Sequence, residues 1–257
     1  MDRTTPIKPK TAILLEKLFE TYHNTSFIVD DPICIPHAYT QLQDIEITAF
    51  FASVLAWGQR KTIIQKCKDL FQRMDNAPYS FILHHSERDL KVLQGFKHRT
   101  FNEIDLLHFV GQLQRIYRQY RSLEDLFSIE STERNVYEGL IRFHRFFLQD
   151  APRRTHKHIS SPIKNSACKR LNMFLRWMVR RDSPVDFGIW KSILPSQLVC
   201  PLDIHVEKAA KRLDLIDTKA KATWSVAVSL TELFKTLCPE DPVKYDYALF
   251  GLSRYGM

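Results

Sequence analysis

The chain has 257 residues, of which 44% are hydrophobic and 26% are charged, enough for the packed core of one large or two small soluble domains. It contains only seven glycines, which argues against a β-rich fold with many tight turns. The formal net charge of +8 favours a polyanionic partner such as a nucleic acid, although an ordinary soluble surface can carry the same charge.

The cysteine and histidine patterns argue against a metal centre. No two of the five cysteines form a C-x-x-C pair, and their odd number and wide spacing are typical of reduced thiols. His84 and His85, and likewise His156 and His158, lack a fuller set of ligands nearby. The chain begins with a polar segment and has no apolar run of membrane-spanning length. We therefore expect a cytoplasmic monomer that binds no cofactor, no metal and no membrane.

Apolar residues spaced three and four apart predict helices throughout the first half of the chain. Gly58 interrupts the strong pattern of residues 44–71 and should end the first of two helices there. Thr100 or Asn102 is expected to cap a long amphipathic helix, after a basic loop at residues 95–99. Further helices are predicted from Thr11, Pro78 and Glu133.

In the second half, residues 150–164 differ from their surroundings in composition. This stretch is basic and lacks apolar periodicity, which indicates a linker or surface arm that offers Arg153, Arg154 and Lys157 to phosphates. Beyond it, helices are predicted at residues 168–181, after Asp203, at residues 224–237 and after Pro242.

No segment favours a strand, so the predicted fold is all-α. We divide it into an N-terminal helix and loop (residues 1–43), a helical lobe (residues 44–150) and a second lobe (residues 151–257).

The helix predicted at residues 168–181 carries cations on one face. Positions three, four, seven and eleven residues after Lys169 share its face. They hold Asn172, Met173, Arg176 and Arg180. A small polar segment precedes this helix, and the free backbone N–H groups at such a helix start bind phosphate well. The pattern predicts phosphate contacts or, alternatively, a solvated basic face on a core helix.

Asp203 immediately precedes another predicted helix. An aspartate there caps the helix and contributes about 1 kcal/mol, which by itself is a sufficient reason for the residue. Pro201 and His205 flank it and make the segment more distinctive.

Taken together, the two segments resemble the helix-hairpin-helix DNA glycosylase superfamily. There, a lysine that follows a hairpin and an aspartate at a later helix start are catalytic. Residues 164–169 fall where the hairpin would be, and Pro-Leu-Asp-Ile-His-Val at residues 201–206 resembles the aspartate segment. Residues 52–59 and 247–254 resemble two further helices of that family, so the resemblance covers most of residues 44–254.

The chain looks most like an uncharacterised bacterial branch of that superfamily. Asp203 follows Lys169 by 34 residues, a separation similar to that of the archaeal 8-oxoguanine glycosylase branch. The usual hairpin contains Gly-x-Gly, whereas this chain has no glycine between Gly139 and Gly188.

The resemblance implies a two-lobed helical fold with a helix-hairpin-helix element. It implies a DNA repair glycosylase with AP-lyase activity that acts on a damaged, for example oxidised, base in double-stranded DNA. Lys169 and Asp203 would be catalytic, without an iron–sulfur cluster. The residues that would contact the nucleic acid are Lys164, Asn165, Ser166, Arg170, Arg176 and Arg180.

Two other hypotheses stay open. One is a non-catalytic DNA-binding protein that keeps the helix-hairpin-helix fold, and the other is an all-α interaction protein with no nucleic-acid role. Aromatic residues that would line a base pocket, if they are not simply part of the core, are Trp57, Phe96, Trp177 and Trp190.

Overall fold

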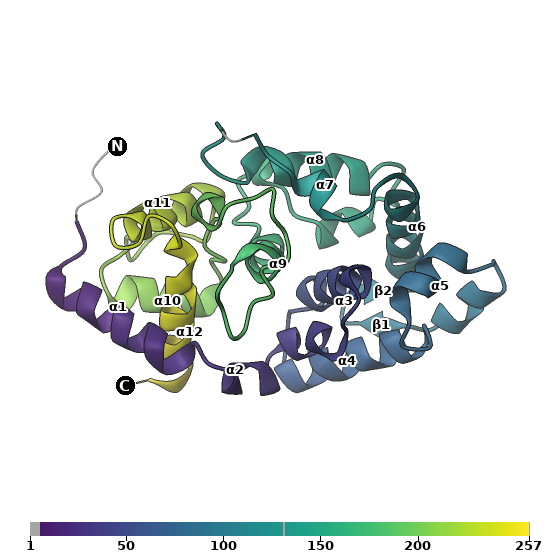
Figure 1. Cartoon of the computed structure of the whole chain (residues 1–257), viewed down its shortest axis with the longest axis horizontal. Coiled ribbons are helices and arrows are strands. Elements are labelled where there is room, and N and C mark those ends of the chain that lie inside the picture. Colours follow the sequence, from purple (N-terminus) through teal and green to yellow (C-terminus); the bar gives the residue numbers. More distant parts are fainter. Residues whose placement is uncertain (1–5, 131, 257) are drawn as a thin grey trace. The chain divides into compact units, whose positions relative to one another are not determined.

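A computed structural model describes residues 6–130 and 132–256. These residues form an almost entirely helical protein, as expected (Figure 1). The only strands in the described part of the chain are β1 (Lys97–His98) and β2 (Phe101–Asn102), which pair as an antiparallel hairpin. This hairpin lies where the sequence suggested a basic loop, and Arg99 at its turn has a positive φ of 55°.

The chain forms two compact units. Unit 1 contains the residues up to Phe27, Ile129–Glu138 and the residues from Ser161 onward. Unit 2 contains Ile28–Ser128 and Gly139–Ser160. These boundaries differ from the three segments expected at residues 1–43, 44–150 and 151–257, because the first helix packs on the last one and residues 28–43 pack with the helices that follow them.

Unit 2 is built on an aromatic core. Phe50, Phe109 and Phe147 are fully buried, and their rings lie 4.8 to 5.7 Å apart. Aromatic side chains of this size bury much apolar area and attract each other edge to face. The helices around this core are α3 (Leu42–Val54), α4 (Arg60–Gln72), α5 (Pro78–His84), α6 (Glu103–Gln119), α7 (Glu124–Phe127) and α8 (Tyr137–Phe147), with 3₁₀ turns η1 (Pro32–Cys34), η2 (Pro36–Ala38), η3 (Asp89–Leu93) and η4 (Thr155–His158).

The junction predicted in the first half of unit 2 is present, but the first helix ends earlier than expected. Helix α3 ends at Val54 rather than at Gly58, which lies in the junction before α4 with a φ of 117°, a conformation that side chains with a Cβ rarely adopt. Asn102 caps α6: its side chain accepts from the Ile104 N–H at 3.1 Å, and Asp105 accepts from the Asn102 N–H at 3.0 Å. This reciprocal capping box explains why the helix begins at Glu103.

The basic stretch after α8 is not the linker or surface arm that its composition suggested. Thr155 donates a hydrogen bond of 2.8 Å to the buried carboxylate of Asp105. Arg154 and His158 lie 3.2 and 3.3 Å from the other oxygen of that carboxylate. A buried charge requires such partners, so the contacts with Asp105 hold this stretch against the start of α6.

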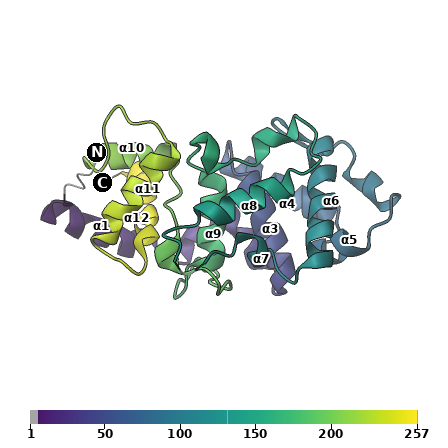
Figure 2. The same ribbon diagram turned by 90° about the horizontal axis from the view of Figure 1, so that it is seen from above.

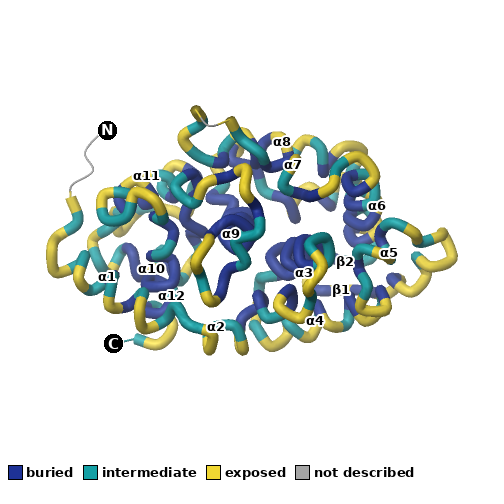
Figure 3. Tube along the Cα trace, viewed as in Figure 1, coloured by how far each residue is buried: buried dark blue, intermediate teal, exposed yellow. Residues whose placement is uncertain are grey.

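Unit 1 gathers α1 (Pro9–Tyr22), α10 (Ile204–Arg212), α11 (Trp224–Lys235) and α12 (Tyr245–Tyr255), which lie together in both views (Figures 1 and 2). The remaining elements are α9 (Lys169–Val179) and the 3₁₀ turns η5 (Pro162–Lys164), η6 (Pro195–Gln197) and η7 (Pro242–Lys244). The short helix α2 (Ser26–Val29) spans the boundary between the units. Helix α9 is buried from Leu171 to Val179 (Figure 3).

Among the described residues, no helix is long and apolar enough to cross a membrane.

Candidate functional site

Lys169 and Asp203, the two residues singled out in the sequence, lie side by side in unit 1. Lys169 is the first residue of α9, and Asp203 is the N-cap of α10. The Lys169 Nζ lies 3.6 Å from the Asp203 Oδ2. The structure therefore brings together a lysine and a carboxylate that are far apart in the chain, at the starts of two helices.

The two oxygens of Asp203 have different partners. Oδ1 accepts from the backbone N–H groups of His205 and Val206 at 2.8 and 2.9 Å, which is the capping role expected from the sequence. Oδ2 faces Lys169. Because capping fixes the orientation of the carboxylate, it also positions Oδ2 toward the amine.

The pair is partly open to solvent. The side chain of Lys169 is 25% exposed and that of Asp203 is 20% exposed. The Lys169 Nζ also lies 3.3 Å from the thioether sulfur of Met173, one turn along α9. An amine in this position is shielded on one side and accessible on the other.

The turn before α9 adopts left-handed backbone conformations without glycine. Asn165 has a φ of 53°, as its tolerance of this region allows, and Cys168 has a φ of 48°. The N–H groups of Trp224 and Ser225 donate to the backbone and side-chain oxygens of Asn165 at 3.1 and 3.3 Å. The turn is therefore held against the start of α11.

Four of the expected nucleic-acid contacts lie at or near this turn. Lys164 and Asn165 are exposed, and Ser166 and Arg170 are half-buried. Burial lowers the pKa of the Arg170 guanidinium. These four residues lie around the entry to α9, and the positive end of a helix dipole favours an anion there.

Arg176 and Arg180 do not form the basic surface predicted from the spacing. They are only 4% and 3% exposed, so neither the phosphate contact nor the solvated face expected of them is correct. The reason is that α9 is apolar on its other sides and is buried all round, so its cations must find partners inside the protein.

The partners of these arginines are carboxylates from distant parts of unit 1. Arg176 forms ion pairs with Asp246 and Asp186. Arg180 lies 3.0 Å from Asp186 and 2.8 Å from Asp241. These contacts form a chain of buried ion pairs along the face of α9 that begins with Lys169.

Several groups in and near these ion pairs have shifted pKa values, among them Asp241, whose pKa burial raises. Burial raises the pKa of Asp246 to about 6, an effect that Arg176 opposes and Asp203 strengthens. Burial also raises the pKa of the Cys200 thiol. At the far end, burial and then the charge of Arg180 lower the pKa of His23 to about 4, so His23 is neutral near pH 7.

Asp186 and Asp246 were not identified from the sequence. A signal was present for each: Asp186 stands between Val185 and Phe187, and Asp246 stands between two tyrosines in an apolar helix. A carboxylate within an apolar run requires a buried partner, and the cations of α9 were available. The sequence does not show which cation is the partner.

The aromatic residues considered for a base pocket lie mostly in the core. Phe96, Trp177 and Trp190 are at most 1% exposed, and Trp57 is half-buried with the Arg99 guanidinium 4.9 Å from its ring. The structure therefore supports a packing role for three of the four.

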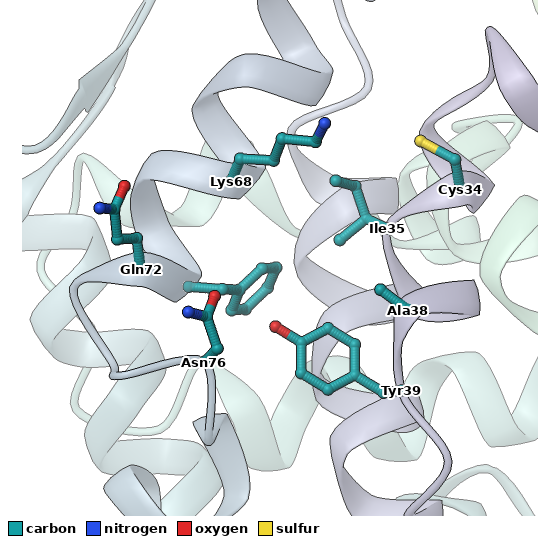
Figure 4. Close-up of a pocket in the computed structure, with 8 residues that line it drawn as sticks. Cys34, Ile35, Ala38, Tyr39, Lys68, Gln72 and Asn76 are labelled. Carbon is teal, nitrogen blue, oxygen red and sulfur yellow. The ribbon is translucent and has the colours of Figure 1, made fainter.

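A separate pocket of about 320 Å³ lies in unit 2, between α4 and the turns η1 and η2 (Figure 4). Phe71 and Ile35 form its apolar wall, and the Tyr39 ring meets that of Phe71 edge on at 6.2 Å. Burial raises the pKa of Tyr39 to about 12, so its hydroxyl stays protonated near pH 7. The other lining residues are Cys34, Ala38, Lys68, Gln72 and Asn76. None of these eight was among the candidate site residues.

The described residues contain no group of three or more histidine, cysteine, aspartate or glutamate side chains arranged to hold a metal ion.

Comparison with known proteins gives one match. Residues 31–254 match a protein family whose description reads "Protein of unknown function (DUF2400)". No curated protein and no solved structure matches the chain.

Proposed function

Since the chain belongs to the DUF2400 family, we propose on the strength of its own residues that it is a DNA repair glycosylase with AP-lyase activity. The observation that carries this proposal is the approach of the Lys169 amine to the Asp203 carboxylate, 3.6 Å apart at two helix starts. The resemblance of both segments to the helix-hairpin-helix glycosylases supports the same assignment, including the two-lobed fold of that family.

The pair has the two groups that the reaction requires. Loss of a damaged base leaves positive charge on the sugar, and the Asp203 carboxylate would stabilise that charge. The uncharged amine of Lys169 would attack C1′, the base would leave with its bonding electrons and a proton, and a Schiff base would form. Elimination of the 3′ phosphate from that Schiff base breaks the strand.

The surface around the pair suits DNA. Lys164 is exposed in the turn before α9, and Arg170 follows Lys169 directly. Basic side chains and free helix N–H groups bind backbone phosphates irrespective of sequence. Such contacts would offset part of the cost of extracting a base from the duplex, which is a few kcal/mol.

A non-catalytic DNA-binding protein is the second candidate. It is favoured by the turn at residues 165–168, where Asn165 and Cys168 carry side chains at left-handed positions that glycine would leave bare. In that case the protein would bind DNA in a salt-sensitive manner, and binding would survive Asp203→Asn without any strand cleavage.

Borohydride trapping distinguishes the two candidates. Duplexes that contain 8-oxoguanine, uracil or an abasic site are incubated with the protein and sodium borohydride, which reduces a Schiff base to a stable covalent adduct. We expect an adduct with the wild-type chain that is lost in Lys169→Gln. Lys17→Gln, the change of an exposed lysine on α1 that has no role in the proposed site, is the matched control and should retain the adduct. Absence of adduct and cleavage on every duplex would contradict the proposed enzyme.

A further inference from the structure

One face of α9 carries a ladder of ion pairs that runs inward from the candidate site. Lys169 pairs with Asp203, Arg176 with Asp246 and Asp186, and Arg180 with Asp186 and Asp241. The arginine side chains are 5% and 3% exposed, and that of Asp186 is fully buried. We call these seven residues the α9 ladder.

The α9 ladder does not balance its charge. It has three cations and four carboxylates, so one negative charge is in excess when all seven groups are ionised. Of the neighbouring basic groups, His23 is neutral near pH 7, and Lys244 is paired with Glu16 at 2.9 Å and acts on Asp241 at the far end of the α9 ladder, away from Lys169. A buried region disfavours an uncompensated charge, and the least costly remedy is to keep a proton on one carboxyl.

Burial raises the pKa of both Asp246 and Asp241, but the Asp241 side chain is 25% exposed, so Asp246 is the carboxyl better suited to keep that proton. Its side chain is 8% exposed and contacts Arg176, and the charges of Lys169 and Asp203 also act on it. The charged and titratable groups that act on it are Arg176, Asp203, Lys169, Asp186 and the Cys200 thiol. Burial and the two neighbouring carboxylates outweigh the two cations, and the pKa of Asp246 rises to about 6 despite its contact with Arg176.

We propose that Asp246 is a positioning residue of the Lys169–Asp203 site, whose protonation state sets the pH range in which Lys169 is reactive. This proposal rests on the proposed function of the pair. An ionised Asp246 adds a second negative charge near Lys169 and favours its ammonium form, which cannot attack a sugar. A protonated Asp246 removes that charge and favours the free amine.

The proton on Asp246 can be measured directly. In the full-length chain labelled with ¹³C at the aspartate carboxyl groups, the resonance that disappears in Asp246→Asn is followed by NMR against pH. We expect its midpoint near 6, as the surroundings of the carboxyl require. A midpoint near 4, the ordinary range of an aspartate, would overturn the proposal.

The influence of Asp246 on Lys169 is measured by borohydride trapping on abasic-site DNA across a range of pH. In Asp246→Asn the rising limb of adduct formation should move to lower pH by about one unit, because the nearby negative charge is absent. Asp246→Glu keeps the charge and should restore the wild-type profile, which a merely structural role for Asp246 would not predict.

The outcomes separate the two proposals. A wild-type chain that forms no adduct at any pH contradicts the proposed function, while the NMR midpoint still decides whether Asp246 holds the proton. A wild-type chain that forms the adduct, with the same pH profile in Asp246→Asn, leaves the glycosylase intact and overturns the role of Asp246.

Discussion

The two units are stabilised by different chemistry. Around Phe50, Phe109 and Phe147, unit 2 has a core of stacked and edge-to-face rings whose packing does not depend on protonation. Unit 1 has comparable apolar packing but adds the α9 ladder in its interior. Because stability from rings is insensitive to pH and stability from buried ionisable groups is not, the units should respond differently to the same conditions.

Unit 2 also contains buried carboxylates: Asp105 is paired with Arg154 and His158, but Glu46 differs from the carboxylates of the α9 ladder. Glu46 is fully buried and accepts hydrogen bonds from Tyr117 and Ser122 and from the N–H of Leu123. Neutral donors therefore satisfy this carboxylate, whereas arginines serve the carboxylates of the α9 ladder. Removing Arg176 or Arg180 takes a cation from two buried or partly buried carboxylates, of which only Asp186 keeps the other arginine. This difference between the units underlies the predictions below.

Breaking the α9 ladder should have the largest effect. Arg176→Met leaves Asp186 and Asp246 without a shared cation, and a broken buried pair costs about 4 to 5 kcal/mol. Guanidinium unfolding of the full chain measures this loss. Arg181→Met, at an exposed neighbouring position, should change the free energy of unfolding by less than about 0.5 kcal/mol. Equal losses in the two variants would show that the α9 ladder is not the cause.

Truncating the aromatic core should cost about as much. Phe109→Ala removes a fully buried ring that contacts four others, and we expect a loss of about 3 to 5 kcal/mol in the free energy of unfolding. The loss should be the same at pH 5 and pH 8, because no ionisable group changes. Phe146→Ala, which alters a half-buried ring, is the control with the smaller cost. If the cost of Phe109→Ala varied with pH, the result would contradict the proposed difference between the two units.

The pH dependence of stability should change in Asp246→Asn. The pKa of Asp246 is about 6 in the folded chain and 3.8 for an ordinary aspartate. Between these values the folded chain holds a proton that the unfolded chain has released, so stability falls as the pH rises through this window and stays lower above it. Relative to Asp246→Asn, the wild type should lose on the order of 3 kcal/mol between about pH 4 and about pH 7.

The difference between those two proteins is the quantity to measure, by thermal or denaturant unfolding at each pH. His23 contributes to the pH dependence of stability in the opposite direction. Because its pKa is lowered, stability is lost as the pH falls from 6.5 toward 4. This contribution is common to both proteins and cancels in the difference. Parallel stability curves would contradict a proton on Asp246.

The smallest effect concerns the cap of α10. Asp203→Ala removes the acceptor of two N–H groups and should cost about 1 kcal/mol. Asp203→Ser keeps a capping oxygen and should cost much less, yet it removes the carboxylate that faces Lys169. Adduct formation should therefore fall in both variants while stability falls mainly in the first. Full activity in Asp203→Ser would reduce Asp203 to a helix cap.

The features predicted from the sequence depend on neighbours within a few residues. The helical pattern, the junction that contains Gly58 and the helix cap at Asn102 are confirmed. The cap at Asp203 belongs to the same group. Helix periodicity, caps and turns are local, and each leaves a mark in a short stretch of residues.

The predictions that failed concern charges whose partners lie far along the chain. Arg154 was assigned to a surface arm because its neighbours in sequence are polar or basic, and Arg176 to a basic face because it shares a helical face with Lys169. Each instead meets a buried carboxylate: Asp105 comes 49 residues before Arg154, and Asp246 comes 70 residues after Arg176. Helical spacing shows which side chains share a face, but not what covers that face.

Lys169 and Asp203 illustrate both the local signals and the long-range contacts. The sequence by itself determined that each residue starts a helix, because the polar entry before α9 and the cap of α10 are local signals. Only the tertiary structure decided that the Lys169 amine faces the Asp203 carboxylate, and that Asp246 and Arg176 continue the same line of charges into the interior. A buried charge without a partner of opposite charge is costly, and this cost selects the partners. It arises only once the chain has folded and excluded water.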